Sequence, residues 1–111
     1  MQFARAPALL ALALFLGCPS QQARAEGRVA EIGIDQYKFI PAEITIKVGD
    51  SVRWTNREKR TSHSVLFAAE NGLESERLFP GESWKRSFAA PGSYGYRCGP
   101  HEEMKGVVHV E

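Results

Sequence analysis

Residues 43–56 read EITIKVGDSVRWTN, and this segment identifies the chain as a β protein. Polar and apolar residues alternate with a period of two in both halves of the segment, as they do in a strand that buries one face. Gly49 and Asp50 lie between the halves and are typical of a tight turn. The segment therefore predicts two short strands joined by a turn.

Similar short runs recur on both sides of this segment. They span residues 28–34, 37–39, 83–88, 93–98 and 106–110, and turn residues such as Pro91 and Gly92 separate them. Residues 68–80 fit either a helical turn or a loop. About seven short strands with frequent turns predict an all-β fold, an antiparallel Greek-key β-sandwich of about seven to eight strands.

The alternation also predicts which side chains share a face of a strand: Ile44, Ile46 and Val48; Val52 and Trp54; Trp84 and Phe88; Tyr94, Tyr96 and Cys98. On this pattern Cys98 points into the core. Arg86 has the parity of Trp84 and Phe88, so we expect its stem to lie along apolar surface and its guanidinium to emerge at an edge. His109 alternates with two valines and is predicted to face solvent.

Length and charge limit the possible functions. The chain has 111 residues, with 14 Lys and Arg against 13 Asp and Glu, so it forms one domain at most and lacks the basic excess of a nucleic-acid-binding protein. Charged residues at 24% together with 11 aromatic residues are too mixed a composition for a disordered tail. These values favour a small binding or carrier protein.

The first 25 residues differ in composition from the rest. Arg5 precedes an apolar run at residues 6–17, and Ala23 and Ala25 supply the small residues that signal peptidase requires. The run is too short to cross a bilayer of ~30 Å as a helix, which argues against the alternative of a retained membrane anchor. We therefore expect a secretory signal peptide at residues 1–25, a periplasmic domain at residues 26–111, and no transmembrane span in the mature protein.

A second exported form is also compatible with the sequence. Residues 15–18 read FLGC, which resembles a bacterial lipoprotein cleavage site. In that form Cys18 would carry a lipid anchor. In the form cleaved after Ala25, Cys98 is the only cysteine, so no disulfide within the chain can stabilise the domain. Cys98 is then either a buried inert thiol or a metal ligand.

The neighbours of Cys98 favour a metal. Cys98, His101 and Met104 follow one another at three-residue intervals, and a sandwich can bring His63 to the same end. Hard cations prefer oxygen ligands, and structural zinc sites use Cys and His, whereas an added thioether favours copper. Two imidazoles, a thiolate and a weak thioether form the blue-copper site of electron-transfer proteins.

Each of these residues also has an ordinary structural explanation. His63 alone fits a hydrogen-bonded strand histidine, Met104 fits core filler, and Cys98 fits a buried thiol. Their joint occurrence favours copper. A catalytic Cys–His pair would need an accessible thiolate, an orienting Asn or Asp and an oxyanion pocket, and nothing in the sequence marks these parts. We therefore expect no catalysed reaction.

From residue 29 to the end, the chain resembles the cupredoxins, the type 1 copper family. The resemblance rests on FIP at 39–41, ITIKVGD at 44–50, VRWTN at 52–56, His63, PGSY at 91–94 and residues 98–106. The short spacing from Cys98 through His101 to Met104 is most similar to the amicyanin branch of the family. The resemblance implies His63, Cys98 and His101 as equatorial copper ligands, Met104 as the axial ligand, and an exposed edge of His101 as the electron exit.

The chain departs from the family pattern at two places, and its charges are unevenly distributed elsewhere. Many cupredoxins tie the two ligand loops together through an Asn after the first His and a hydroxyl residue after the Cys. Ser64 and Gly99 hold these positions, so we expect that tie to be reduced or absent. Glu102 and Glu103 follow His101, where amicyanins are more apolar, and this suggests a partner with positive charge. Arg57, Lys59 and Arg60 precede His63, and Glu70, Glu74 and Glu76 form an acidic run; such charges either solvate loops or steer an encounter.

The sequence therefore predicts a periplasmic, monomeric type 1 copper protein that carries single electrons between a donor and an acceptor protein. An alternative is a copper storage or delivery protein with the same ligands. A third possibility is a metal-free sandwich that serves as a binding module.

Overall fold

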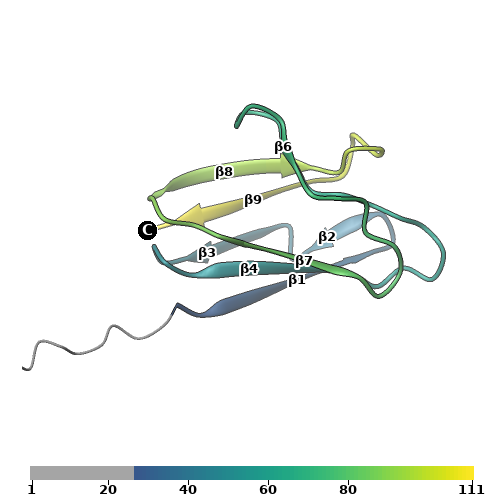
Figure 1. Ribbon diagram of the computed structural model, residues 1–111, viewed down its shortest axis with the longest axis horizontal. Helices are drawn as coiled ribbons and strands as arrows, with labels where there is room; N and C mark the ends of the chain where they lie inside the picture. The colour runs from purple at the N-terminus through teal and green to yellow at the C-terminus, as the bar shows by residue number, and fades with distance from the viewer. Residues whose placement is uncertain (1–26) are drawn as a thin grey trace, which may run out of the picture.

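The computed structural model describes residues 27–111, which form two β-sheets that pack face to face (Figure 1). The nine strands are β1 (Val29–Asp35), β2 (Lys38–Ile40), β3 (Glu43–Ile46), β4 (Ser51–Asn56), β5 (Leu66–Phe67), β6 (Leu73–Glu74), β7 (Ser83–Ser87), β8 (Gly92–Arg97) and β9 (Lys105–Val110). The predicted all-β sandwich is confirmed. The predicted signal peptide and Cys18 lie outside the described residues.

The pairing of the strands is mixed rather than purely antiparallel. One sheet has the order β2-β1-β4-β7 and the other the order β3-β9-β8-β5-β6. β1 pairs with β4 in parallel, and β3 pairs with β9 in parallel, with Ile44 opposite Val108. The prediction of an antiparallel sandwich was wrong at these two pairs. Alternation along a strand shows which face is buried, but it contains no information on the direction of a distant neighbour.

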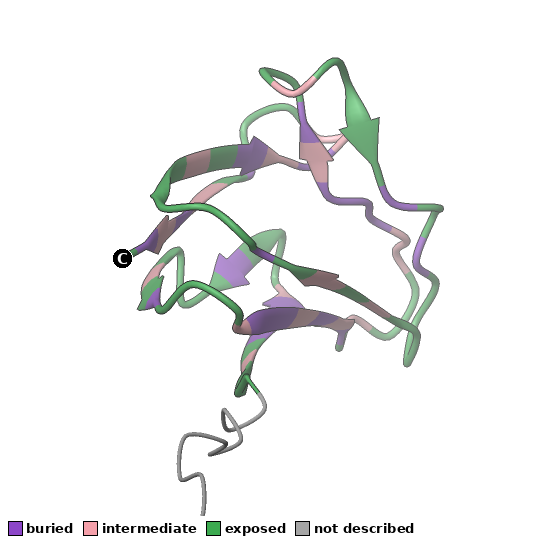
Figure 2. Ribbon diagram, turned by 60° about the vertical axis from the view of Figure 1, so that its left-hand side comes forward, coloured by how far each residue is buried: buried purple, intermediate pink, exposed green. Residues whose placement is uncertain are grey.

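The core lies between the sheets, and its centre is aromatic. Trp54 has no exposed surface, and its ring contacts those of Phe67, Trp84 and Tyr96 at centroid distances of 6.1, 5.5 and 5.3 Å. Burial raises the pKa of Tyr96 to about 12. In Figure 2, purple buried residues alternate with pink and green ones along strands of both sheets. Ile46, Val52, Tyr96 and Cys98 are buried as the alternation predicts.

Val48 is the exception among the predicted core residues, because 46% of it is exposed. β3 ends at Ile46, and the chain then turns. The N–H of Asp50 donates to the carbonyl of Lys47 at 2.9 Å and closes this turn. The alternation of polar and apolar residues thus continues to Val48, although the strand itself ends at Ile46.

Arg86 confirms the expectation of a charged head at the edge of an apolar surface. Its guanidinium carbon lies 4.3 Å from the ring centroid of Phe67 and 4.4 Å from that of Phe88. Both terminal nitrogens donate to the carboxylate of Glu70, at 2.9 and 2.7 Å. Glu70 belongs to a turn between β5 and β6, so the loop alternative for residues 68–80 is confirmed, with one short strand inside it.

We expect Glu70→Gln to lower the free energy of unfolding by about 1 kcal/mol at pH 7, since solvent screens this one-third exposed side chain. The Arg86 guanidinium holds the pKa of Glu70 below its ordinary 4.5. The contribution is therefore present above pH 4.5 and is lost as the pH falls through the lower folded-state pKa. Urea unfolding at several pH values measures it, and Glu102→Gln serves as an exposed control. An equal difference between wild type and Glu70→Gln at pH 7 and at pH 2 would contradict the assignment.

Within residues 27–111 the structure contains no helix with the length and hydropathy needed to span a membrane.

Candidate metal centre

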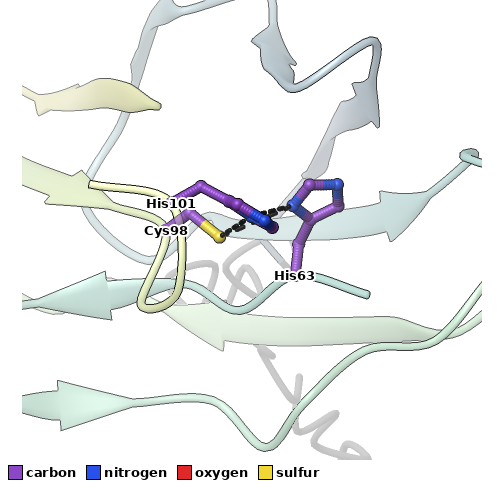
Figure 3. A group of neighbouring side chains, drawn as sticks. All are labelled: His63, Cys98 and His101. Atoms are coloured by element: carbon purple, nitrogen blue, oxygen red, sulfur yellow. Dashed lines mark hydrogen bonds between the residues drawn. The ribbon is translucent and has the colours of Figure 1, made fainter. Parts of the chain in front are cut away.

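The structure brings His63, Cys98 and His101 together at one end of the sandwich (Figure 3). The Cys98 Sγ lies 3.5 Å from the Nδ1 atoms of both histidines, and the two Nδ1 atoms are 3.2 Å apart. His63 and Cys98 have no exposed surface, while His101 is half-buried. Three of the four predicted ligands thus direct their donor atoms at one point.

The donor triangle has the right size for a small metal ion. A point at the centre of a triangle with sides of 3.2–3.5 Å lies about 2 Å from each corner. This distance is the usual length of a bond between zinc and an imidazole nitrogen. Two nitrogens and one sulfur are borderline to soft ligands, so the set suits copper or zinc and excludes Ca²⁺ and Mg²⁺.

The loop between β8 and β9 carries Cys98, His101 and Met104. The N–H of Met104 donates to the carbonyl of His101, and the N–H of Cys98 donates to the carbonyl of Met104, both at 3.0 Å. These two bonds close the loop on itself. Met104 is only 2% exposed and belongs to the core cluster, so the fourth predicted ligand is buried within the ligand loop.

His63 lies on an irregular segment rather than on one of the named strands. It forms an isolated bridge with Leu78, in which the N–H of each residue donates to the carbonyl of the other at 3.0 and 2.7 Å. Asn56 supports the same segment, because its Nδ2 donates to the carbonyls of Thr61 and Leu78. The bridge therefore holds the backbone of His63 against the backbone of Leu78, which belongs to a later segment of the chain.

Glu58 orients the ring of His63 and was not predicted from the sequence. Its Oε2 lies 2.9 Å from His63 Nε2, so the carboxylate accepts the Nε2 proton and leaves Nδ1 facing Cys98. Burial raises the pKa of Glu58, but the N–H of Tyr37 and the His63 ring outweigh burial and hold that pKa below its ordinary value. The signal in the sequence was a carboxylate five residues before His63, which is too common a spacing to recognise.

Tyr37 covers the two histidines and was also missed. Its ring meets those of His63 and His101 edge to face, at centroid distances of 5.5 and 4.9 Å. Gln36 and Tyr37 form the two-residue turn between β1 and β2, and their φ values of 51° and 59° lie in the left-handed region. Such turns favour Asn and Gly. The tight turn places Tyr37 beside the donor atoms, although residues 37–39 had been predicted as a strand.

A tie between the two ligand loops is present, so the expectation that it is reduced or absent was wrong in its second half: the tie remains, with one side chain instead of two. The N–H of Gly99 donates to Ser64 Oγ at 3.0 Å, and the N–H of Ser64 lies 3.5 Å from Cys98 Sγ. A hydroxyl and a backbone amide therefore replace the expected pair of side chains. The sequence could not show this, because a backbone group takes part.

His109 lies outside the centre, as predicted. Its side chain is 36% exposed, and its ring nitrogens are 2.8 Å from Ser93 Oγ and from the carboxylate of Glu43. Glu102 and Glu103 are exposed next to His101.

Comparison with known proteins agrees with the donor set. The sequence profile described as "Copper binding proteins, plastocyanin/azurin family" matches residues 28–111. Amicyanin-alpha from Methylorubrum extorquens is 37% identical over 103 residues, which cover 89% of this chain and 86% of that protein. Amicyanin from Paracoccus denitrificans is 35% identical, over 84% of this chain and 76% of that protein.

A plastocyanin and a solved structure extend the similarity. The chloroplastic plastocyanin of Tetradesmus obliquus is 40% identical over 85 residues, which cover 66% of this chain and 58% of that protein. A Cu(I) structure of an amicyanin variant superposes with a TM-score of 0.71 at 30% identity, over 82% of this chain and 88% of that one.

Proposed function

Because the chain belongs to the plastocyanin/azurin family of copper-binding proteins, a family of electron carriers whose cofactor is copper, we propose that it carries single electrons between redox proteins. The observation that carries the proposal is the triangle of Nδ1, Nδ1 and Sγ atoms formed by His63, His101 and Cys98. Copper bound there would supply a one-electron couple between Cu(I) and Cu(II). We assign these three residues as equatorial ligands and Met104 as the axial ligand.

The residues around the donors favour electron transfer over chemistry on a substrate. Within residues 27–111, His63 and Cys98 are fully buried and Met104 is nearly so, so these side chains offer a substrate almost no exposed surface. Glu58, the His63–Leu78 bridge and the closed loop hold the donors in place before the metal arrives. The ligand set suits both Cu(I) and Cu(II), and its atoms move little when the oxidation state changes. The energy needed to rearrange the site during electron transfer is therefore small.

His101 is the surface end of the proposed route. It is the one member of the donor triangle with exposed surface, so a partner can approach the copper through its ring edge. Glu102 and Glu103 are exposed beside it and favour a partner with a positively charged face, an attraction that weakens with salt. We further propose that residues 1–25 direct the chain to the periplasm and that residues 26–111 act there as a monomer.

The test is to add one equivalent of Cu(II) to the purified protein and to cycle it electrochemically with a Cu(I) chelator present. We expect one copper per chain, a reversible one-electron wave, and copper retained in both oxidation states. Release of Cu(I) to the chelator would favour copper delivery instead. Failure to bind copper while His63, Cys98 and His101 are intact and reduced would overturn the proposal.

A further inference from the structure

Glu74 reaches from the edge strand β6 to the point where the two ligand loops meet. Ser64 Oγ donates its proton to Glu74 Oε2 at 2.7 Å and accepts the N–H of Gly99 at 3.0 Å. Ser64 is 1% exposed, and the N–H of the same residue lies 3.5 Å from Cys98 Sγ. A single serine thus joins Glu74, the loop after Cys98 and the thiol itself.

The carboxylate determines the direction of these hydrogen bonds. An ionised carboxylate only accepts, so it fixes the Ser64 hydroxyl as a donor toward Glu74. The lone pairs of that oxygen then remain free for the Gly99 amide. Without Glu74, the hydroxyl could rotate and the bond to Gly99 would lose its fixed acceptor.

Gly99 provides a second and independent observation. A Cβ built at this position collides with the carboxylate oxygen of Glu74 and lies 2.6 Å from Ser64 Oγ. The absence of a side chain at position 99 is therefore matched by a glutamate that fills the same space. The two positions are complementary in shape as well as in hydrogen bonding.

Two side chains of opposite charge, Arg97 and Glu74, contact the loop that follows Cys98. Nη1 of Arg97 donates to the carbonyls of Cys98 and Gly99 at 2.8 and 3.1 Å. The positive charge of the Arg97 guanidinium therefore lies against this part of the loop. Glu74 contributes a negative charge that reaches the same loop through Ser64. A negative charge near a metal stabilises the more positive of its two oxidation states.

We propose that Glu74 is a positioning residue that holds the Ser64–Gly99 tie and, through its charge, stabilises Cu(II) over Cu(I) and lowers the reduction potential of the site. The inference rests on the proposed copper function for its electrostatic part. The positioning part concerns the protein alone and stands without metal.

The electrostatic part is tested by the reduction potential of the copper-loaded Glu74→Gln variant. The amide oxygen of glutamine can still accept from Ser64, so this variant removes charge and keeps the hydrogen bond. We expect the equilibrium to shift toward Cu(I) about threefold, which is ~28 mV for a one-electron couple. Both glutamates are exposed, and Glu76→Gln is the matched control, since it removes the same charge two residues away from a side chain that is not bonded to Ser64. Equal potentials for both variants would overturn the electrostatic part.

The positioning part is tested on the metal-free protein by hydrogen exchange of the Gly99 amide. We expect Glu74→Ala to accelerate exchange about tenfold and Glu74→Gln to change it little. Gly99→Ala should be less harmful in the Glu74→Ala background, because the colliding carboxylate is gone, and a double-mutant cycle in unfolding free energy measures this coupling. Unchanged exchange in Glu74→Ala together with additive free energies would overturn the tie. These readouts need no copper, so they separate this inference from a failure of the proposed function.

Discussion

Replacing Cys98 by serine is expected to abolish the intense blue absorption of the Cu(II)-loaded protein. The sulfur is the only thiol among the described residues and sits 3.5 Å from both Nδ1 atoms, so the thiolate–copper bond can form nowhere else in that part of the chain. A hydroxyl is a harder and far weaker ligand for copper. The metal-free Cys98→Ser protein should keep its fold, since serine occupies nearly the same volume. Visible spectra before and after one equivalent of Cu(II), with circular dichroism of the metal-free form, check both statements.

Two histidine variants serve as controls for this result. His109→Gln should keep the colour, because the His109 ring hydrogen-bonds Ser93 and Glu43 and does not belong to the group formed by His63, Cys98 and His101. His63→Gln should lose the colour as Cys98→Ser does. A blue Cys98→Ser protein, or a colourless His109→Gln protein, would show that the site is wrongly assigned.

We expect Asn56→Ala to lower the free energy of unfolding by about 3 kcal/mol and to weaken copper binding. Asn56 has no exposed surface, and its side chain makes three hydrogen bonds. Nδ2 donates to the carbonyls of Thr61 and Leu78, and Oδ1 accepts the N–H of Glu58. Alanine leaves the Thr61 carbonyl and the Glu58 N–H without this partner, while the Leu78 carbonyl keeps the N–H of His63. The cost of the two unpaired buried groups is larger than the hydrogen bonds themselves contribute.

The effect should extend to the metal centre because the same segment carries Glu58 and His63. Chemical unfolding of the metal-free protein and competition for copper with a chelator measure the two losses. Ser83→Ala is the control: it removes a 2.8 Å hydrogen bond with Thr55 that lies at the surface, so its effect on either quantity should be small. Equal stability losses for the two variants would contradict the role assigned to Asn56.

The longer strands were predictable because local alternation reports directly which face of a strand is buried, whereas the two-residue strands β5 and β6 were not predicted. Ser51–Asn56 and Gly92–Arg97 illustrate this, with Trp54, Tyr96 and the following Cys98 all buried as expected. The parallel pairing of β3 with β9 was not predictable in the same way. It joins Ile44 to Val108, and neither segment contains a signal for the direction of the other.

The meeting of His63, Cys98 and His101 was predictable for a chemical reason, and its surroundings were not. Few residue types bind soft metals, so a Cys, two His and a Met stand out even when their spacing is only partly regular. Glu58, Tyr37 and Glu74 act through hydrogen bonds and ring contacts that depend on the folded chain. Glutamate and tyrosine are common on surfaces, so nothing in the sequence distinguishes these three from their neighbours.

The position of β9 has a consequence for the order of events during synthesis. This strand, Lys105–Val110, pairs with β3 on one side and β8 on the other, so β3 has no partner in the second sheet until the ribosome has made residues 105–110. Contacts that join segments so far apart in sequence form late and slowly. Cys98, His101 and Met104 lie just before this strand, and their loop is held between β8 and β9. A nascent chain that does not yet include residues 105–110 therefore cannot capture copper in the assembled site, and metal loading follows the pairing of β9.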